Sequence, residues 1–483
     1  MKSILPILLS MMLLGSTVFS QQQAPAVHTI IEREMQDRAI PGLQIAVIHK
    51  GKIALNQSYG IANMADQIPV DQNTIFAINS CTKVFSAVAM MQLVEHRKVI
   101  LTSPIAAYLD SLPEAWKEVT VQQMLTHSSG LPDLLKLLDD KTGGLGSFRD
   151  EHAVWEKLKT LPMDFQPGEM FRYNQTNAYL IGRIIERFEK KSFAESFADN
   201  QFAPIGMQHT IFGDSRDVIP HSAPTYFYRS VEDGRTLKDK KLVNNYYEFP
   251  YFRRTASGLN SSALDLAKWV IALQSGKFLK TKQALATMWS PIKFNNGSPT
   301  PWALGWGMNK FRAQHRAVGM SGGGRSAFLI YPDDELAVIV LTNLGGSYPE
   351  DFLEEIAGCY VPGILKADPI TFLKTNLRAI GYEKAIELTD KQRAIDPQFQ
   401  PNEFELNEWA YRMMARNQLK EAKAILELNV HLFPASWNAY DSYGDVLLKT
   451  GDSKNAILMY KKSVDLNPGN DHAKKVLEKV STP

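Results

Sequence analysis

The sequence is poor in the residues that build metal centres and disulfide frameworks. Cys81 and Cys359 are the only cysteines among 483 residues, and the ten histidines show neither His-Glu-x-x-His spacing nor a Cys-x-x-Cys companion. The sequence therefore predicts no metal site and no cofactor. Two cysteines so far apart permit a disulfide in an oxidising compartment without implying one, and two free buried thiols are the default expectation.

The chain also lacks any concentration of charge. Its 53 basic and 51 acidic residues give a formal net charge of +2 and form no long run of one sign. Nucleic-acid surfaces and polybasic membrane surfaces depend on such runs, so the sequence predicts neither partner. Composition names no other partner.

The first twenty residues have the pattern of a secretory signal. Lys2 gives a positive start, Ile4–Leu14 is almost wholly apolar, and Val18-Phe19-Ser20 places compact residues before Gln21. The apolar run is shorter than the roughly 20 residues of a spanning helix, which disfavours the alternative of a retained anchor. We expect residues 1–20 to be a cleaved signal peptide. The mature protein is then secreted or periplasmic, with no integral membrane span.

Residues 21–361 mix strand-like runs with amphipathic helices. Leu43–His49 and Lys52–Ser58 form a hairpin pattern near the start, and Ser326–Tyr331 and Leu336–Thr342 form another near the end. Strands at both ends with helices between them predict an α/β (α+β) domain. Its central antiparallel sheet is flanked by helices, and its first and last strands pair.

Beyond residue 361 the strand pattern stops and a repeat appears. Its period is 34 residues, as seen in the pairs Asn417 and Gly451, Ala422 and Ala456, and Pro434 and Pro468. This period is typical of tetratricopeptide repeats, each a pair of helices. We expect such repeats over residues 403–483, after a helical linker or cap at residues 362–402. The repeats either bind a protein partner or form a structural appendage, and the sequence does not choose between the two.

Ser80 and Lys83 are the strongest local candidates for chemistry. They precede the apolar helix Val84–Val94, so the Lys83 side chain lies one helical turn beyond Ser80 on the same face. A serine hydroxyl is a weak nucleophile, and a neighbouring amine with a lowered pKa activates it by accepting its proton. The simpler interpretation is a helix-capping serine beside a solvated lysine. Cys81 offers a thiol next to Ser80, but its sequence neighbourhood supplies no His or Asn of the thiol-protease kind.

Further motifs follow Ser80–Lys83 in order along the chain. They are Leu125-Thr126-His127-Ser128-Ser129-Gly130-Leu131-Pro132, Phe165-Gln166-Pro167-Gly168, Phe171-Arg172-Tyr173, Ala256-Ser257-Gly258-Leu259, Leu304-Gly305-Trp306-Gly307 and Gly319–Gly324. With them, the region from Pro41 to Asn343 resembles the superfamily of class C β-lactamases, penicillin-binding DD-peptidases and β-lactamase-fold esterases. The resemblance implies that fold and a serine acyl-enzyme.

The resemblance also implies roles for two polar residues. Tyr173 matches the family's catalytic tyrosine, which together with Lys83 would relay a proton between Ser80 and the leaving group. Gln175 stands where the family has an asparagine that binds the substrate amide. Its own amide has the same donor and acceptor on a stem one methylene longer.

The family's third element is a strand that carries a cation, a small residue and a glycine. Here it reads Met320-Ser321-Gly322-Gly323. Met320 has neither charge nor a hydrogen-bond donor, which disfavours β-lactam hydrolysis. The small residues let a substrate lie against the strand, and the resemblance implies an oxyanion hole made by the N–H groups of Gly323 and Ser80.

Several neighbouring residues have two interpretations. Arg325 either supplies the missing cation or is an exposed turn arginine, the more common case. His127 suggests the triad of an α/β-hydrolase, but no Gly-x-Ser-x-Gly elbow surrounds Ser80, and the resemblance makes the His127 segment structural. The aromatic-rich segment Asp214–Arg254 either walls a cleft that selects an apolar acyl group or packs as a loop.

The sequence therefore predicts a serine hydrolase that acts through a Ser80 acyl-enzyme on an ester, a peptide or a β-lactam-like amide. Met320 and Gln175 favour an esterase or a D-amino-acid peptidase over an efficient β-lactamase. The competing hypothesis is a catalytically weak scaffold whose repeats bind a protein partner. The intact set of Ser80, Lys83 and Tyr173 counts against it.

Overall fold

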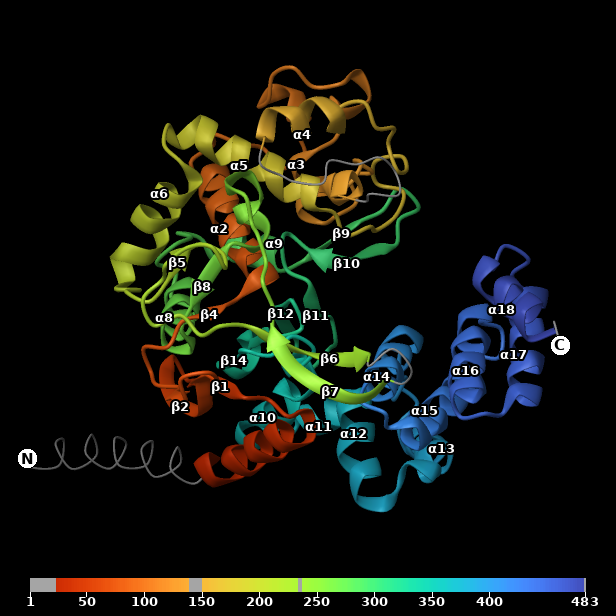
Figure 1. Cartoon of the computed structure of the whole chain (residues 1–483). Helices are drawn as coiled ribbons and strands as arrows, with labels where there is room; N and C mark the ends of the chain where they lie inside the picture. The colour runs from red at the N-terminus through yellow and green to blue at the C-terminus, as the bar shows by residue number, and fades with distance from the viewer. Residues whose placement is uncertain (1–22, 139–149, 233–236, 482–483) are drawn as a thin grey trace, which may run out of the picture. The chain divides into compact units, whose positions relative to one another are not determined.

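The computed structural model describes residues 23–138, 150–232 and 237–481 (Figure 1). The chain divides into two compact units, Met1–Val361 and Pro362–Pro483. The expected signal peptide at residues 1–20 lies outside the described residues. Within the described ranges, no helix combines the length and the apolar character that crossing a membrane requires.

The first unit is built on a seven-stranded antiparallel sheet with the order β11-β12-β13-β14-β1-β2-β3. Its strands are β1 (Gly42–His49), β2 (Lys52–Asn63), β3 (Ile68–Pro69), β11 (Met308–Lys310), β12 (Ala317–Gly322), β13 (Ser326–Tyr331) and β14 (Leu336–Thr342). β1 pairs with β14, so that Leu43 lies opposite Thr342. The predicted pairing of the first and last strands is confirmed.

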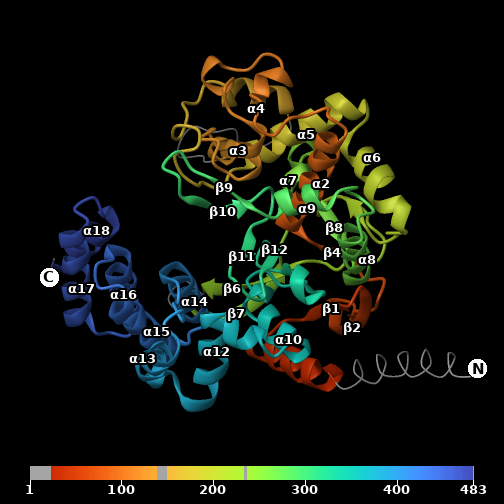
Figure 2. The same ribbon diagram turned by 180° about the vertical axis from the view of Figure 1, so that it is seen from behind.

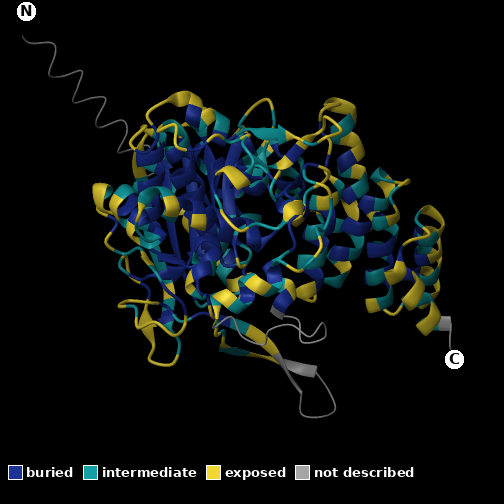
Figure 3. Cartoon of the chain, turned by 90° about the horizontal axis from the view of Figure 1, so that it is seen from above, coloured by how far each residue is buried: buried dark blue, intermediate teal, exposed yellow. Residues whose placement is uncertain are grey.

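Both faces of the central strands are covered by helices, which explains their continuous apolar sequences. On one face, Ile339 and Leu341 join the main core together with α2 (Thr82–Glu95) and α8 (Ala263–Gln274). On the other face lie α10 (Leu353–Tyr360) and a helix over residues 23–38, side by side in Figures 1 and 2. Figure 3 shows the buried residues concentrated around these strands.

Smaller elements complete the first unit. They are the three-stranded sheet of β4 (Phe76–Ala77), β8 (Leu259–Ser261) and β5 (Ile211–Phe212), the pairs β6 (Tyr226–Glu232) with β7 (Leu237–Asn244) and β9 (Pro291–Lys293) with β10 (Pro299–Ala303), and the helices α3 (Val121–Leu125), α4 (Glu151–Leu158), α5 (Gln175–Glu189), α6 (Phe193–Phe197), α7 (Arg254–Ser257) and α9 (Lys282–Met288). The aromatic-rich segment at 214–254 holds the β6–β7 hairpin, of which residues 233–236 lie outside the described residues.

The described part of the second unit is helical. Its helices are α11 (Ile364–Ala367), α12 (Pro369–Ile380), α13 (Ala385–Ile395), α14 (Glu403–Ala415), α15 (Leu419–Leu432), α16 (Trp437–Lys449), α17 (Ser453–Leu466) and α18 (Asp471–Ser481). α14 packs on α15, and α16 on α17. Both helices of the later pair begin 34 residues after their counterparts in the earlier pair. Gly444 lies where α16 meets Tyr460 of α17, and a Cβ there would stand 2.8 Å from the Tyr460 ring.

Candidate active site

Ser80 lies in a short 3₁₀ turn, Asn79–Cys81, that leads directly into α2. Every residue of α2 from Thr82 to Met91 is buried, so the helix runs through the main core and has a fixed position. Ser80 itself is half-buried at the entrance to this helix. The nucleophile candidate is therefore positioned by the start of a buried helix, while Ser80 itself stays partly exposed.

The Lys83 ammonium lies beside the Ser80 hydroxyl. Lys83 is only 4% exposed, and its Nζ donates to Ser80 Oγ at 3.3 Å and to the carbonyl oxygen of Ala256 at 2.8 Å. Nζ also reaches Gln175 Oε1 at 3.4 Å. Burial lowers the pKa of Lys83 from its usual value of 10.5, although the Tyr173 phenol opposes the shift. The amine is thus prepared to accept a proton at a lower pH than a solvated lysine.

Tyr173 contacts the same hydroxyl from a second direction. Its phenol donates to Ser80 Oγ at 2.8 Å, and its ring lies 4.7 Å from Lys83 Nζ. The next residue, Asn174, caps α5 by accepting hydrogen bonds from two backbone N–H groups of the first turn. This cap fixes the backbone on which the Tyr173 ring stands. Ser80 Oγ is therefore held between an amine and a phenol, each within hydrogen-bond distance.

Gly322 lies against the turn that carries Ser80. A Cβ at Gly322 would stand 2.1 Å from the carbonyl oxygen of Ile78 and 3.0 Å from the amide nitrogen of Ser80. The Ser326 hydroxyl ties the same region together by donating to the Ile78 carbonyl at 2.8 Å. Only glycine fits at this distance from the Ser80 turn. The close approach places the end of β12 beside Ser80. The next residue, Gly323, is exposed and has a positive φ of 59°.

The other residues of β12 have different surroundings. Met320 is 2% exposed and its side chain belongs to the main hydrophobic core, whereas Ser321 is half-buried. The structure thus brings Ser80, Lys83, Tyr173 and Gln175 together with Gly322. Met320 instead contributes apolar packing.

Cys81 is fully buried directly next to Ser80. Its thiol contacts the carbonyl oxygen of Met320 at 3.6 Å, and burial raises its pKa to about 12. The thiolate is the reactive form of cysteine, so this thiol is a poor nucleophile at neutral pH. Cys81 and Cys359 are both free, but Cys359 is only half-buried, which differs from the expectation of two buried thiols.

Two contributors to this site were not assigned a role from the sequence. The Ala256 carbonyl gives Lys83 its shortest hydrogen bond, and a backbone carbonyl has no signature in a residue type. Trp302 packs against Tyr173 with ring centroids 5.4 Å apart, whereas Trp306 is fully buried in the core. Trp302 lies in β10 and Trp306 in the turn after it, and a tryptophan is compatible with either environment, so only the fold separates the two.

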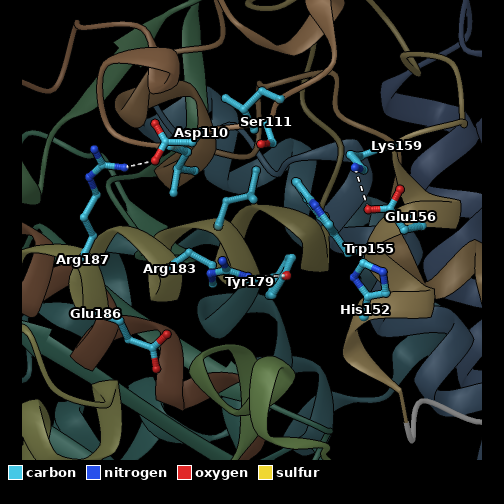
Figure 4. Close-up of a pocket in the computed structure, with 13 residues that line it drawn as sticks. Asp110, Ser111, His152, Trp155, Glu156, Lys159, Tyr179, Arg183, Glu186 and Arg187 are labelled. Carbon is cyan, nitrogen blue, oxygen red and sulfur yellow. Dashed lines mark hydrogen bonds and ion pairs between the residues drawn. The ribbon is translucent and has the colours of Figure 1, made fainter.

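A cavity of about 630 Å³ lies elsewhere on the first unit, between α4, α5 and the segment at 109–112 (Figure 4). Four of its charged side chains form two ion pairs, Arg187 with Asp110 at 2.6 Å and Lys159 with Glu156 at 2.8 Å. Tyr179 and Trp155 form part of its wall. Neither Ser80 nor Lys83 lines it.

One cluster in the second unit has the residue types of a cation site. Asp441, Asp445 and His472 bring ligand atoms within 4.8 Å of one another. Their oxygens are already used, because Asp445 accepts hydrogen bonds from Tyr411 and Tyr460, both at 2.6 Å. The cluster therefore acts as a polar network between helices, buried at Asp441 and exposed at His472.

The sequence of the first unit is similar to those of known proteins. A family model described as Beta-lactamase matches residues 27–357. Protein flp of Staphylococcus aureus (strain MW2) is 26% identical over 343 residues, which cover 70% of this chain and 66% of flp. Penicillin-binding protein 4* of Bacillus subtilis (strain 168) is 27% identical over 337 residues, which cover 67% of this chain and 72% of that protein. The chain thus spans just under two-thirds of the length of flp.

A solved structure gives the same result at the level of the fold. The octameric penicillin-binding protein homologue from Pyrococcus abyssi superposes with a TM-score of 0.60 and 26% sequence identity. The superposition covers 73% of this chain and 81% of that chain.

Proposed function

The chain belongs to the beta-lactamase family, and from this membership and the geometry at Ser80 we propose that it forms an acyl-enzyme on Ser80 and hydrolyses esters or peptide amides. The observation that carries the proposal is the position of Ser80 Oγ, 3.3 Å from Lys83 Nζ and 2.8 Å from the Tyr173 phenol. A hydroxyl held between a buried amine and a phenol has the surroundings of an activated nucleophile.

The reaction proceeds in two halves. Ser80 Oγ attacks the substrate carbonyl while Lys83 Nζ takes the hydroxyl proton, and the N–H groups of Ser80 and Gly323 stabilise the oxyanion. Tyr173 and Lys83 then deliver that proton to the departing alcohol or amine, which leaves the acyl group on Ser80. A water molecule then attacks the ester carbonyl and gives one proton to the same pair. The bond between the acyl carbon and Ser80 Oγ breaks, the pair returns the proton to Oγ, and the acid is released.

Esters and peptides are favoured over β-lactams by the departures from the family pattern. Met320 replaces the cation of the third motif, and its side chain is buried in the core. Gln175 Oε1 contacts Lys83 Nζ, so this amide is partly engaged before any substrate arrives. The Met320 replacement removes a charge that a β-lactamase would use, and the Lys83 contact leaves the donor end of the Gln175 amide for a substrate.

Two wider proposals concern the whole protein. The signal-like residues 1–20 support secretion or a periplasmic location. The period of 34 residues between helix pairs supports tetratricopeptide-like repeats that bind a protein partner in the second unit. A catalytically weak scaffold would need no assembled hydroxyl, amine and phenol, so the enzyme proposal is favoured over it.

The test is labelling of the mature protein with a fluorophosphonate probe, read by intact mass, alongside turnover of 4-nitrophenyl acetate. Ser80→Ala should lose the label and lower turnover by roughly 10³-fold or more. Ser86→Ala is a matched control, because Ser86 is a buried serine of the same helix that bonds the Thr255 carbonyl. Equal labelling of both variants, or none in the unmutated protein, would favour the scaffold.

A further inference from the structure

Trp302 is a half-buried tryptophan of β10 whose ring lies next to the Tyr173 phenol, with ring centroids 5.4 Å apart. The same indole stacks on Phe171 at 5.6 Å, with 27° between the two ring planes. It also stands nearly perpendicular to the His127 imidazole, at 5.1 Å. The Trp302 ring therefore contacts Tyr173 itself, a second ring of the same segment, and the histidine that packs on the phenol.

The backbone at Gly307 encloses the indole further. A Cβ at Gly307 would lie 2.1 Å from the nearest ring carbon of Trp302, so the indole lies directly against this backbone. The indole Nε1 is buried without a hydrogen-bond partner among the described residues. The ring thus supplies contact area at this position, not a hydrogen bond. Close packing on several sides restricts such a ring to one orientation.

The turn after β10 connects Trp302 to the helix that carries Lys83. Gly305 in this turn has a positive φ of 82°. A Cβ there would stand 2.5 Å from the Cβ of Ala87 on α2 and 3.5 Å from the carbonyl oxygen of Lys83. The Gly305 N–H donates to the carbonyl oxygen of Leu125, the last residue of α3, at 2.8 Å. One short segment therefore touches α2 through Gly305 and the phenol through the Trp302 ring.

We propose that Trp302 is a positioning residue that holds the Tyr173 phenol against Ser80 Oγ. The inference rests on the proposed function, because the phenol acts in the reaction of the Ser80 site. Ser80 and Lys83 are carried by the start of α2, whereas Tyr173 stands on a different segment of the chain. Their separation is therefore set by packing between the two segments. Trp302 provides that packing, and proton transfer depends on it because a displacement of about 1 Å already slows an enzymatic step.

The experiment is a double-mutant cycle on the turnover of 4-nitrophenyl acetate. Trp302→Leu removes the ring contacts, so kcat should fall by roughly 10- to 100-fold with little change in KM. Tyr173→Phe removes the phenol hydroxyl itself. If Trp302 acts through that hydroxyl, Trp302→Leu should cost less than about 3-fold in the Tyr173→Phe background. Equal losses in the two backgrounds would mean that Trp302 acts independently of the phenol, and would overturn the proposal.

A conservative variant and a matched tryptophan separate positioning from general destabilisation. Trp302→Phe keeps an aromatic ring and should recover part of the loss, and it carries the cycle if the leucine variant does not fold. Trp155→Leu is the matched control, because Trp155 is also half-buried and its ring contacts Trp116 and Tyr179. It should lower the melting temperature but change kcat by less than about 3-fold. A loss of kcat equal to that of Trp302→Leu would overturn the proposal.

The pH profile of kcat/KM gives a readout that a purely structural role would not move. Burial lowers the pKa of Lys83, and the Tyr173 phenol opposes that shift. If the phenol retreats in Trp302→Leu, the opposition is lost, and the midpoint of the rising limb should move to lower pH. Arg253 and Asp133, the other charged groups that act on Lys83, are not substituted. An unchanged midpoint would mean that the phenol has not moved, and would overturn the proposal.

Failure of the inference and failure of the proposed function give different results. If Ser80→Ala abolishes turnover but Trp302→Leu keeps its kcat, the hydrolase stands and the positioning role does not. If the unmutated protein hydrolyses no ester, the hydrolase proposal fails, and crystal structures of the unmutated and Trp302→Leu proteins then decide the inference alone. A Tyr173 phenol beyond hydrogen-bond distance of Ser80 Oγ in the variant would support it, and a retained hydrogen bond would overturn it.

Discussion

The imidazole of His127 packs on the phenol ring of Tyr173, with ring centroids 4.6 Å apart. His127 also holds the backbone on both sides of Tyr173. Its Nδ1 accepts a hydrogen bond from the Asn174 N–H at 3.1 Å, and its carbonyl oxygen accepts one from the Arg172 N–H at 2.9 Å. A backbone N–H only donates, so Nδ1 is the acceptor and the proton of the neutral ring lies on Nε2. His127 is thus a positioning residue for Tyr173.

Replacing His127 removes the Nδ1 acceptor and should shift the position of Tyr173, while Tyr173 itself stays in the protein. In His127→Phe the aromatic packing is kept, but the Asn174 N–H loses its partner, so kcat for 4-nitrophenyl acetate should fall by roughly 10- to 100-fold. KM should change little, and His127→Asn, which keeps an acceptor, should recover part of the loss. Steady-state kinetics check this, with the exposed His152→Phe as control. A rise in KM with unchanged kcat would contradict the positioning role.

The same histidine should make stability depend on pH. Burial, with a smaller effect of Lys83, holds the pKa of His127 well below its usual value of 6.5. Below about pH 6.5 the unfolded chain therefore binds a proton that the folded chain excludes. The free energy of unfolding should fall as the pH drops from 6.5 towards the lowered pKa. Melting curves at pH 7 and pH 5 test this, and the drop should be smaller in His127→Asn.

Lys83 should set the acidic limb of the pH profile of kcat/KM. Its pKa lies below 10.5 because of burial, and only the neutral amine accepts the Ser80 proton. We expect kcat/KM to rise with pH through a midpoint below 10.5. Lys83→Arg keeps a cation that never deprotonates, so activity should fall by roughly 10²- to 10⁴-fold. A variant that retained the rising limb would exclude Lys83 as the base.

Lys83 should affect stability in the same pH window. Between its lowered pKa and 10.5, the unfolded chain binds a proton that the folded chain lacks. The contribution of Lys83 to the free energy of unfolding therefore rises with pH in that window. It is lost as the pH falls through the window to the lowered pKa.

The close approach of β12 to Ser80 should tolerate no side chain. In Gly322→Ala the new Cβ would lie 2.1 Å from the Ile78 carbonyl, so the strand end or the Ser80 turn must move. A displacement of this kind should lower ester turnover by roughly 10²-fold. Gly345→Ala is the control, because its Cβ would meet ordinary contacts, the nearest being the Tyr226 carbonyl at 3.5 Å. Full activity of Gly322→Ala would show that the approach is not required.

Forcing α16 and α17 apart should lower the thermal stability of the second unit without reducing ester turnover. A Cβ in Gly444→Ala would lie 2.8 Å from the Tyr460 ring, and the Tyr460 phenol is fixed by its hydrogen bond to Asp445. Overpacking of this kind costs about 1–3 kcal/mol. Calorimetry should show the transition of the second unit shifted to lower temperature. A loss of ester turnover would instead indicate that the Ser80 site depends on the second unit.

The sequence determined those features that depend on neighbours along the chain. Ser80 and Lys83 meet because residues three apart share a helix face. The strands on either side of Pro332–Asp334 pair because a short turn brings them together, and the apolar runs of β1 and β14 indicate strands buried on both faces. Tyr173 was identified as a site residue only because the ordered motifs resemble those of a known family. No local pattern would have selected it.

The tertiary structure decided everything that depends on distant contacts. Tyr173 reaches Ser80 across 93 residues of chain, and the Ala256 carbonyl reaches Lys83 across 173. Arg325 has the sequence of an exposed turn, but its surroundings bury it and leave only 6% of it exposed. The burial and pairing of a side chain are set by which elements pack around it. That packing arises from contacts far apart in sequence, which the identity of the residue and its immediate neighbours do not record.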